Sequence, residues 1–544
     1  MACQNSPPMD FMKLHLQKAV FYNVAITFLL LLSFLFFICH GANILIVIPF
    51  TSPSHYILLR PLGLELARRG HNVTAITGNK EKNPPKNYHE IMVDDIKIWD
   101  VVSGRPNVFT MLSVSDEEFY EKILWGANLA LLERALNSNR VQKFFDNDEK
   151  FDLVICEQFF QEATYILAHK YQAKLALITT FGNCMKHNIV TRNPLQLATI
   201  APEFIYVNNP TSFWGRLRSL YFTVYEFLWW KFWFLEKQEQ VVKKYIKNLP
   251  EPVPSLYEMQ QKASLMLVNS HFSFETPIAY LPNIIEIGGI HLSHSDGKLD
   301  KDLKDLLDRS SNGVVYMNFG SNVKSSELPT EKKNAFLNVF RKLNQTVLWK
   351  WEDDILDNKP KNLETRKWLP QKEILAHPNV KIFIAHGGLI GMQEATYNGV
   401  PVLGIPIYAD QFNNILDAEK KGFAKILRFE DIEEKLLENI IFEILNNDSY
   451  KKKATEISRR FKDRPMTPLD TAIFWLEYTL RNNNAEALKN PAIELNWIAY
   501  LMLDVYVFVL LCCILIMYVS VKIVQKIKLS IVKNEKLSKR KKDS

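Results

Sequence analysis

The feature that most constrains how this chain can fold is the alternation of short apolar runs with segments of helical spacing. The runs are rich in Val, Ile and Leu and lack the polar alternation of a half-exposed strand. They therefore predict strands buried on both faces, as in a parallel sheet. Because the segments between them have helical apolar spacing, we expect an α/β fold in which helices cover the sheets.

The alternation occurs in two blocks, residues 43 to 182 and 313 to 425, with several prolines between residues 250 and 282. Ligands of open α/β sheets bind at the carboxyl ends of the strands, so two facing units predict a cleft between them. The expected strands are Asn43–Pro49, Val73–Thr77, Phe151–Cys156, Lys174–Ile178, Val314–Asn318, Val347–Trp351, Val380–Ala385 and Val402–Ile405. The expected helices are Tyr56–Arg69, Thr330–Leu343, Leu389–Asn398 and Asn413–Lys421.

The first 41 residues have the pattern of a secretory signal peptide. Lys13 and Lys18 form a sparse basic region, and residues 25 to 39 are almost wholly apolar. Gly41 is small enough for a cleavage site. An uncleaved signal anchor is the alternative, because the stretch before the apolar run is long.

Residues 497 to 521 form a second apolar run, interrupted only by Asp504 near its start. About 20 helical residues cross the hydrocarbon core of a bilayer, so this run predicts a transmembrane helix. Basic residues crowd only its C-terminal side, which places the tail in the cytosol and the body in the lumen. The chain ends with Lys541 and Lys542 at the fourth and third positions from its terminus, as in a dilysine retrieval signal of the endoplasmic reticulum.

The formal net charge of +7 is a property of the tail, because residues 522 to 544 hold eight Lys and one Arg against two acids. The body is then close to neutral and has no nucleic-acid footprint. Of six cysteines, only Cys156 and Cys184 belong to the body, and they have no metal-binding spacing. We expect both to be buried thiols, with a disulfide between them as the alternative. Three sequons give glycosylation candidates in the luminal part, at Asn72, Asn344 and Asn447.

An aromatic segment, residues 213 to 245, lies between the two blocks and holds four Trp residues among many Phe and Tyr. Its apolar residues surround the helix more than they form one stripe. Two interpretations stay open on this pattern. The segment is either a wall of a ligand pocket or a membrane-surface contact, or it is a helix buried in the first block.

The stretch from Trp368 to Gln411 is the richest in functional chemistry. His386-Gly387-Gly388 ends a strand and opens a helix, where backbone N–H groups suit a diphosphate. Trp368 offers a flat face for a base, and Glu394 lies two turns along the same helix, where it suits a ribose. Asp410 and Gln411 follow the next strand and suit sugar hydroxyls.

These residues resemble the signature of the UDP-glycosyltransferases, in particular the membrane enzymes of the animal UDP-glucuronosyltransferase type. The resemblance covers nearly all of the mature chain. It extends to Pro53-Ser-His55, Arg69-Gly-His-Asn-Val-Thr74, Leu267-Val-Asn-Ser-His-Phe272, Ile287-Gly-Gly-Ile290, Phe319-Gly-Ser321, Arg464-Pro-Met-Thr-Pro-Leu-Asp470 and Leu503-Asp-Val505.

The family resemblance implies the GT-B fold, which consists of two facing Rossmann-like domains with an interdomain cleft. It implies an acceptor domain at residues 42–285 and a UDP-sugar domain at 286–465. Helices at 466–496 return to the first domain and the membrane, followed by the transmembrane helix at 497–521 and the basic tail at 522–544. It also implies inversion at the anomeric carbon without a metal or other cofactor, the UDP-sugar being a co-substrate.

The resemblance also implies roles for individual residues. His55 would be the general base that takes the proton of the acceptor, and Glu157, where the family usually has Asp, would orient it. Ser321 and His386, with Gly387 and Gly388, would contact the diphosphate, Trp368 and Gln371 the uracil, Glu394 the ribose, and Asp410 and Gln411 the transferred sugar.

Two departures bear on the identity of the sugar. Glucuronate-using relatives have Arg where Asn269 stands and Asn where Ile390 stands. Without that cation, we favour UDP-glucose over UDP-glucuronate as the donor. The expected acceptor is a small lipophilic molecule. The alternatives are a catalytically weak lipophile-binding protein and a glycosyltransferase that acts on a membrane lipid. A homo-oligomer is compatible with the sequence, which does not indicate one.

Overall fold

The computed structural model describes residues 41–94, 98–101, 107–109, 114–147, 149–182, 184–293 and 299–542. The described chain divides into a large unit, up to residue 189 and from 193 to 489, and a small unit of residues 190–192 and those from 490 onward. Residues 1–40 lie outside the described part. The expected signal peptide therefore has no structural counterpart here, apart from its last residue.

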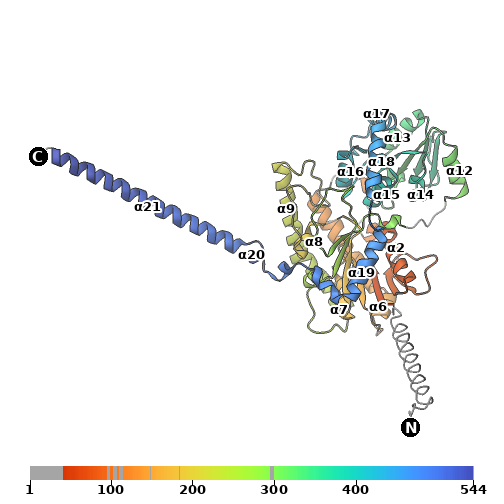
Figure 1. The fold of residues 1–544 in the computed structure, drawn as a ribbon. Coiled ribbons are helices and arrows are strands. Elements are labelled where there is room, and N and C mark those ends of the chain that lie inside the picture. The colour runs from red at the N-terminus through yellow and green to blue at the C-terminus, as the bar shows by residue number, and fades with distance from the viewer. Residues whose placement is uncertain are drawn as a thin grey trace, which may run out of the picture. The chain divides into compact units, whose positions relative to one another are not determined.

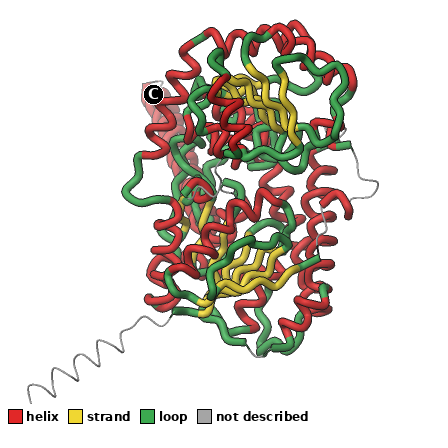
Figure 2. Tube along the Cα trace, turned by 90° about the vertical axis from the view of Figure 1, so that its right-hand side faces the viewer, coloured by secondary structure: helices red, strands yellow, loops and turns green. Residues whose placement is uncertain are grey.

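The large unit contains two parallel sheets, each in its own lobe with helices packed around it (Figure 2). The first sheet has seven strands in the order β3-β2-β1-β4-β5-β6-β7, and every described pairing is parallel. Its strands are β1 (Asn43–Ile48), β2 (Asn72–Thr77), β3 (Tyr88–Met92), β4 (Leu153–Glu157), β5 (Lys174–Ile178), β6 (Leu265–Val268) and β7 (Ile284–Glu286).

Helices cover the first sheet on its faces and edges, as Figure 1 shows for α2, α6 and α7. The described helices of this lobe are α2 (Pro53–Arg68), α3 (Ile98–Val101), α4 (Asp116–Glu118), η2 (Phe119–Ala127), α5 (Asn128–Asn137), α6 (Asn139–Phe145), η3 (Glu162–Tyr165), α7 (Ile166–Lys170), α8 (Met185–Thr191), α9 (Phe213–Trp229), η4 (Trp230–Phe234), α10 (Leu235–Tyr245), α11 (Leu256–Gln261) and η5 (Ile290–Leu292).

The second sheet has six strands in the order β10-β9-β8-β11-β12-β13, also parallel in every described pairing. Its strands are β8 (Val314–Asn318), β9 (Thr346–Lys350), β10 (Leu363–Arg366), β11 (Val380–Ala385), β12 (Val402–Gly404) and β13 (Ala424–Ile426). Two apolar clusters of buried residues pack against this sheet. Its helices are α12 (Lys301–Arg309), η6 (Ser325–Glu327), α13 (Thr330–Lys342), α14 (Gln371–Leu375), α15 (Leu389–Asn398), α16 (Gln411–Lys420), α17 (Glu434–Asn446) and α18 (Asp448–Lys462).

After α18 the chain returns to the first lobe through α19 (Pro468–Arg481), followed by η7 (Asn483–Leu488). Thr467 caps α19 by accepting a hydrogen bond from the Asp470 amide, and Pro468 occupies the first turn, where no amide hydrogen is needed. Leu469, Ala472 and Leu476 then join the apolar core of the first sheet together with residues of α2. The last α-helix of the large unit, α19, thus packs into the same apolar core as the strands and helices of the first block of sequence.

All eight strands expected from the sequence are confirmed to within two residues at either end, and the α/β class is confirmed with them. Five strands were missed: β3, β6, β7, β10 and β13. Most of these are short or lie toward the sheet edges, where partial exposure removes the continuous apolar run that marks a buried strand. The helices over Tyr56–Arg69, Thr330–Leu343, Leu389–Asn398 and Asn413–Lys421 are confirmed as α2, α13, α15 and α16.

The burial expected for the aromatic segment is confirmed for one side of it, whereas a membrane-surface contact stays a prediction and none of its residues lines the cavity described below. The helices α9, η4 and α10 are continuous and have two apolar faces. One face is buried in the first lobe through residues such as Phe222, Trp230 and Phe234. The opposite face, called here the exposed α9 face, consists of side chains that are 43% to 74% exposed: Phe213, Trp214, Leu217, Leu220, Tyr221, Val224, Leu228, Trp229 and Phe232.

The small unit contains η8 (Pro491–Glu494), α20 (Trp497–Tyr500) and the long helix α21 (Leu503–Lys542). Within it, the Arg192 guanidinium lies over the rings of Trp497 and Tyr500, at 3.7 and 4.6 Å from the ring centroids. Residues 503 to 539 are long and apolar enough to cross a membrane. The long helix begins at Leu503 and not at Trp497 as the sequence suggested, because Met502 has φ +53° and interrupts the helix between α20 and α21. It also continues through the basic tail, which has no Gly or Pro to end it.

Cys156 and Cys184 are both buried free thiols, as expected, and do not form the alternative disulfide. Burial raises the pKa of Cys156 to about 12. The three sequon asparagines, Asn72, Asn344 and Asn447, are all exposed.

The return of α19 can be tested by truncating one side chain of its buried face. Leu476→Ala removes a side chain with no exposed surface, so we expect the free energy of unfolding to fall by about 2–5 kcal/mol. Phe474→Ala on the same helix changes a ring that is 43% exposed and serves as the control, with an expected change of about 0.5 kcal/mol or less. Chemical denaturation of the detergent-solubilised chain measures both, and equal changes would contradict the packing of α19 described above.

Candidate active site

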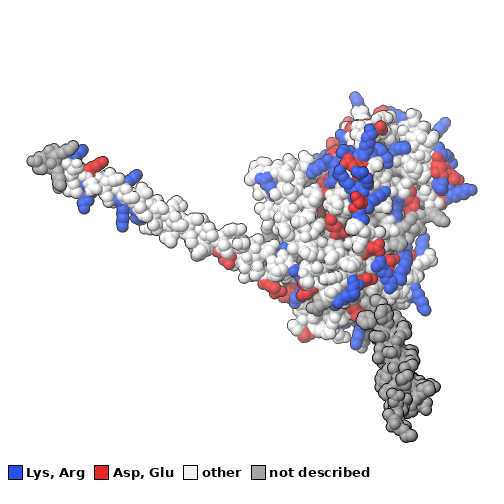
Figure 3. All heavy atoms as spheres, viewed as in Figure 1, with Lys and Arg blue, Asp and Glu red and all other residues white. Residues whose placement is uncertain are grey.

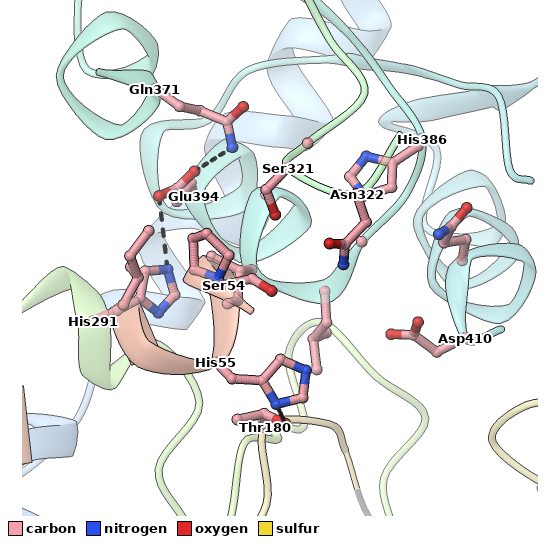
Figure 4. Close-up of a pocket in the computed structure, with 18 of the residues that line it drawn as sticks. Ser54, His55, Thr180, His291, Ser321, Asn322, Gln371, His386, Glu394 and Asp410 are labelled. Carbon is pink, nitrogen blue, oxygen red and sulfur yellow. Dashed lines mark hydrogen bonds and ion pairs between the residues drawn. The ribbon is translucent and has the colours of Figure 1, made fainter. Parts of the chain in front are cut away.

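In each sheet the strand order reverses at one point, and residues near both points line one cavity. In the first sheet the reversal lies between β1 and β4, and in the second between β8 and β11. Loops leave such a point on opposite sides and open a crevice at the carboxyl ends of the strands. The cavity has a volume of about 510 Å³ and is lined by residues from both lobes. Figure 4 shows His55 on one side of it, facing Ser321, Asn322 and Asp410 on the other.

The first-lobe side is centred on His55, which lies in the first turn of α2 and is 7% exposed. Its Nδ1 contacts Oε1 of Glu157, the last residue of β4. Thr180, just after β5, places Oγ1 3.1 Å from the same Nδ1 and donates a hydrogen bond to Glu157 Oε1 at 3.0 Å. Because a carboxylate accepts at Nδ1, that nitrogen carries the hydrogen, and Nε2 is left with its lone pair.

Aromatic side chains surround this histidine. The ring centroids of Phe50, Phe159 and Phe181 lie 4.5, 4.7 and 5.7 Å from that of His55. Further along, Phe119, Ile123, Leu124 and Phe204 continue the apolar wall of the cavity. The first-lobe side therefore suits an apolar ligand whose polar group reaches His55.

Two residues expected to bind nucleoside are linked to each other in the second lobe. Gln371, at the start of α14, donates from Nε2 to Glu394 Oε2 at 2.6 Å. Its Oε1 accepts a hydrogen bond from Asn318 Nδ2 at 2.7 Å. Burial raises the pKa of Glu394 to about 7. Nearby, His291 Nε2 lies 4.0 Å from Glu394 Oε1, and burial lowers the pKa of this histidine to about 3.

His386 follows β11 and is enclosed by glycine backbone on two sides. A Cβ at Gly320 would lie 2.8 Å from His386 Cε1, and a Cβ at Gly388 would lie 2.6 Å from its Nε2. Burial, together with the charge of Lys350, lowers the pKa of His386 to about 4. The imidazole is therefore neutral at pH 7. Its Nδ1 is buried and has no hydrogen-bond partner among the described residues, and the residue lines the cavity.

Asp410 and Gln411 lie at the start of α16, and Asp410 lies across the cavity from His55 (Figure 4). Asp410 Oδ2 accepts a hydrogen bond from Asn414 Nδ2 at 2.7 Å, and burial raises its pKa to about 6. Gln411 Oε1 accepts hydrogen bonds from the amides of Ile407 and Tyr408, and the Gln411 side chain is also hydrogen-bonded to the Tyr408 side chain, so its orientation is fixed. Ala409 holds this turn with φ +56°, a conformation that is costly for a residue with a Cβ.

Ser321 and Trp368 line the cavity with solvent-exposed side chains; the Trp368 ring is 61% exposed. Gly387 does not line the cavity. Its φ of +90° and its close approach to α16, where a Cβ would lie 2.8 Å from Gln411 O, give it a structural part in the turn.

The two positions that were expected to report on the sugar differ in location. Ile390 lines the cavity. Asn269 is fully buried and does not line the cavity. Its side-chain Nδ2 donates to the main-chain oxygen of Thr180 at 3.0 Å, and its main-chain carbonyl oxygen accepts from Gln393 Nε2 at 3.2 Å. Asn269 thus connects α15 of the second lobe to the loop that carries Thr180.

Three residues at this site were not predicted from the sequence: Thr180, His291 and Lys350. Thr180 and Lys350 each lie at the carboxyl end of a strand that the sequence predicted, so a search of all strand ends for polar side chains would have found them. Lys350 Nζ donates to Gly320 O at 3.0 Å and to Glu352 at 2.7 Å. No pattern singled out His291, which follows a glycine pair.

The enclosure of His386 predicts a specific epistasis. Gly388 has φ −59°, so Ala is acceptable to its backbone and only the contact with the imidazole opposes it. We expect Gly388→Ala to lower the free energy of unfolding by about 1–3 kcal/mol. In a His386→Ala background the same substitution should cost about 0.5 kcal/mol or less. A double-mutant cycle by chemical denaturation measures the difference, and additive effects would contradict the contact.

Comparison with known proteins relates this geometry to a family. The family model described as "UDP-glucoronosyl and UDP-glucosyl transferase" matches residues 125–538. Among curated relatives, the UDP-glycosyltransferase UGT5 of Dactylopius coccus is 36% identical over 508 residues, covering 91% of this chain and 94% of that relative. The UDP-glucosyltransferase 2 of the same organism is 34% identical, with coverage of 94% and 98%. The human UDP-glucuronosyltransferase 2B15 is 28% identical, with coverage of 87% and 91%.

Solved structures agree on the architecture. A UDP-glucose:anthocyanidin 3-O-glucosyltransferase in complex with UDP has a TM-score of 0.54 and 15% identity, covering 81% of this chain and all of that chain. The spinosyn forosaminyltransferase SpnP has a TM-score of 0.53 and 16% identity, with coverage of 81% and 100%. The two parallel sheets around one cavity are accordingly those of the GT-B fold. With most of its length matched, this chain belongs to the family of UDP-glucuronosyl and UDP-glucosyl transferases.

Proposed function

We propose that this UDP-glycosyltransferase transfers a hexose, glucose in preference to glucuronic acid, from a UDP-sugar to a hydroxyl group of a small lipophilic acceptor. The single observation that carries the proposal is the position of His55. Its Nδ1 is held by Glu157 and Thr180, and it lies between an apolar wall and the second-lobe groups expected to bind the UDP-sugar. No metal or organic cofactor is invoked.

His55 acts in this proposal as the general base. As the acceptor oxygen bonds to the anomeric carbon, its proton moves to His55 Nε2. The bond from the anomeric carbon to the β-phosphate oxygen breaks, and UDP leaves with that electron pair. Attack opposite the leaving group inverts the anomeric centre. The buried Glu157 carboxylate stabilises the imidazolium and fixes its tautomer.

The second lobe supplies the donor contacts. Trp368 offers its exposed face to the uracil, and Glu394 accepts from the ribose hydroxyls. Ser321 and His386 contact the diphosphate at the glycine-lined turn, where the Lys350 ammonium adds a positive charge nearby. Asp410 and Gln411 hold the sugar hydroxyls, opposite the general base.

The preference for glucose rests on charge. A glucuronate would bring a second anion toward Asp410, and the cavity side of α16 offers it no described Lys or Arg. The neutral Asn269 supplies no cation from behind the wall. A relative that covers 94% of this chain is itself named a glucosyltransferase, which supports the same choice.

The proposed setting is the endoplasmic reticulum. One helix of the described chain is apolar and long enough to anchor it in a membrane, in agreement with membrane anchoring in the family. We propose a single-pass type I topology with a cleaved signal at residues 1–41, a luminal body formed by the two lobes, and retrieval through Lys541 and Lys542. The boundary between the lobes lies after η5 and not at residue 285 as the resemblance implied, because β7 and η5 belong to the first lobe. Glycans at Asn72, Asn344 and Asn447 are part of this proposal, since all three lie on the surface.

A donor-by-acceptor activity matrix with the purified full chain tests the proposed function. UDP-glucose and UDP-glucuronate are each combined with a phenol, a lipophilic alcohol and a membrane lipid, and UDP release is measured. We expect kcat/KM to favour UDP-glucose by at least about tenfold, which corresponds to about 1.4 kcal/mol. Preference for UDP-glucuronate would refute the charge argument, and activity confined to the lipid would favour a membrane-lipid glycosyltransferase.

Replacing the base separates acidic from weakly acidic acceptors. A phenol with a pKa near 10 is about 3.5 pKa units above a histidine, so full proton transfer costs roughly 5 kcal/mol. An aliphatic alcohol is far less acidic and depends more on the base. We expect His55→Ala to abolish transfer to alcohols and to leave measurable transfer to acidic phenols. Undiminished turnover of both acceptor types would refute the role of His55.

The raised pKa of Glu394 predicts pH-dependent binding of UDP. Ribose hydroxyls bind best to the carboxylate, whose population falls as the pH drops below the pKa of about 7. From pH 7.5 to 6.0 the Kd for UDP should therefore rise roughly eightfold. The phosphate of UDP also titrates, at a pH of about 6. Glu394→Gln is therefore measured in parallel, to separate the contribution of the phosphate from that of Glu394. Identical pH profiles for both proteins in calorimetric titrations would exclude Glu394 as the ribose acceptor.

A further inference from the structure

The exposed α9 face is apolar and open to solvent within the described large unit, where Tyr221 alone of its residues has a described side-chain hydrogen bond, to Glu117 at 3.5 Å. Phe213, Leu217, Leu220, Val224 and Leu228 recur every three or four residues, which places them along one side of the helix. A soluble protein rarely exposes a continuous apolar patch of more than a few hundred Å² (about 300–600 Å²) without a function for it. Figure 3 shows the surface around α9, at the outer edge of the lobe, as almost free of charged groups.

The opposite side of the segment is held by buried contacts, so the helix cannot turn its exposed side chains inward without breaking them. Glu226 is buried 3.7 Å from the Lys186 ammonium. Trp230 is fully buried and donates from Nε1 to Glu162 Oε1 at 2.8 Å. Rotation of the helix to hide its exposed face would break both contacts and leave buried charges unpaired, which is costly.

The composition of α9 indicates the chemistry of the partner. Its only acid is the buried Glu226, and Arg216 is exposed between the apolar side chains, whereas Arg218, also exposed, is ion-paired with Asp116 of α4. Trp214, Tyr221 and Trp229 combine an apolar ring with one polar atom, a combination suited to the boundary between lipid and water. A helix face of aromatic and aliphatic groups with an exposed arginine is typical of a helix that lies at the surface of a bilayer.

A bilayer is also the surface that this chain always has within reach. The same polypeptide carries α21, which is long and apolar enough to span a membrane. Tethering makes a second, weaker membrane contact effectively intramolecular, so a modest affinity of the exposed α9 face is sufficient.

The exposed α9 face is connected to the cavity through one layer of protein. Tyr225 of α9 donates its hydroxyl hydrogen to Glu121 Oε1 at 3.2 Å, and its ring stacks on Trp125 with centroids 6.1 Å apart. Glu121 and Trp125 belong to η2, the same segment whose Phe119, Ile123 and Leu124 line the cavity. The wall that would contact an acceptor thus rests directly on α9.

We propose that the exposed α9 face docks into the headgroup layer of a bilayer and that lipophilic acceptors enter the cavity from this layer. The entry route rests on the proposed function, whereas the docking does not. Docking positions η2 beside the lipid, where an apolar acceptor is concentrated by partition, at about 0.8 kcal/mol for each buried methylene group.

Fluorescence of an environment-sensitive label tests the docking without donor or acceptor. The full chain is reconstituted in phosphatidylcholine vesicles containing about 20% phosphatidylserine, with the label on Leu220→Cys or, as the control, Ile355→Cys. Ile355 is an equally apolar side chain, 75% exposed, in the second lobe. The unsubstituted chain, labelled in parallel, corrects for native cysteines. We expect a lipid with a nitroxide near its headgroup to quench the label at position 220 by about half or more and to leave position 355 unquenched.

Each outcome of the quenching experiment decides the docking. Absence of quenching at position 220, or equal quenching at both positions, would overturn it. A blue shift at position 220 without quenching would mean that protein, such as a second copy of this chain, covers the face, and would also overturn the docking.

The entry route is tested by Trp214→Ser combined with Leu217→Ser and Leu220→Ser. In vesicles, the KM for a long-chain alcohol should rise about fivefold or more, while the KM for a water-soluble phenol should not change. Equal KM effects on both acceptors would overturn the route while leaving the docking intact. Loss of all turnover in the parent chain would instead count against the proposed function.

Discussion

The structure depends on the parallel pairing of β1, β4 and β5, because it brings three strand ends to one point. His55 follows β1, Glu157 ends β4 and Thr180 follows β5. Glu157 and Thr180 lie 102 and 125 residues after His55 in the chain, yet their side chains lie within hydrogen-bond distance of its ring. A buried carboxylate is costly unless it has hydrogen-bonding partners, so the imidazole and the hydroxyl stabilise it while it orients them.

The two lobes divide the chemistry by polarity. The first lobe surrounds its histidine with phenylalanine rings, which make that side of the cavity apolar. The second lobe presents amides, carboxylates and glycine backbone, which suit a nucleotide sugar. The two lobes are also hydrogen-bonded to each other. Asn413 Nδ2 donates to the carbonyl oxygens of Pro202, Glu203 and Ile205 at 3.1–3.2 Å.

Buried, continuous apolar strands were predictable because burial on both faces leaves a run that polar residues do not interrupt. Such runs gave β1, β5, β8 and β11 almost to the residue. Short strands near the edges were not predictable, since half-exposed strands such as β3 and β10 tolerate polar side chains and carry no distinct local signal. Motif spacing located the donor side, because its residues lie within one continuous stretch of the second block.

The sequence by itself determined the α/β class and an apolar C-terminal segment. It also singled out residues most of which line one cavity, together with Glu157, which contacts His55. Only the tertiary structure decided what lies beside what. It showed that Thr180 completes the contact with His55, that Asn269 acts behind the cavity wall, and that α9 buries one apolar face and exposes the other. The physical reason is the same in each case: local patterns report the burial of a residue, whereas contacts between distant strand ends arise only when the sheets assemble.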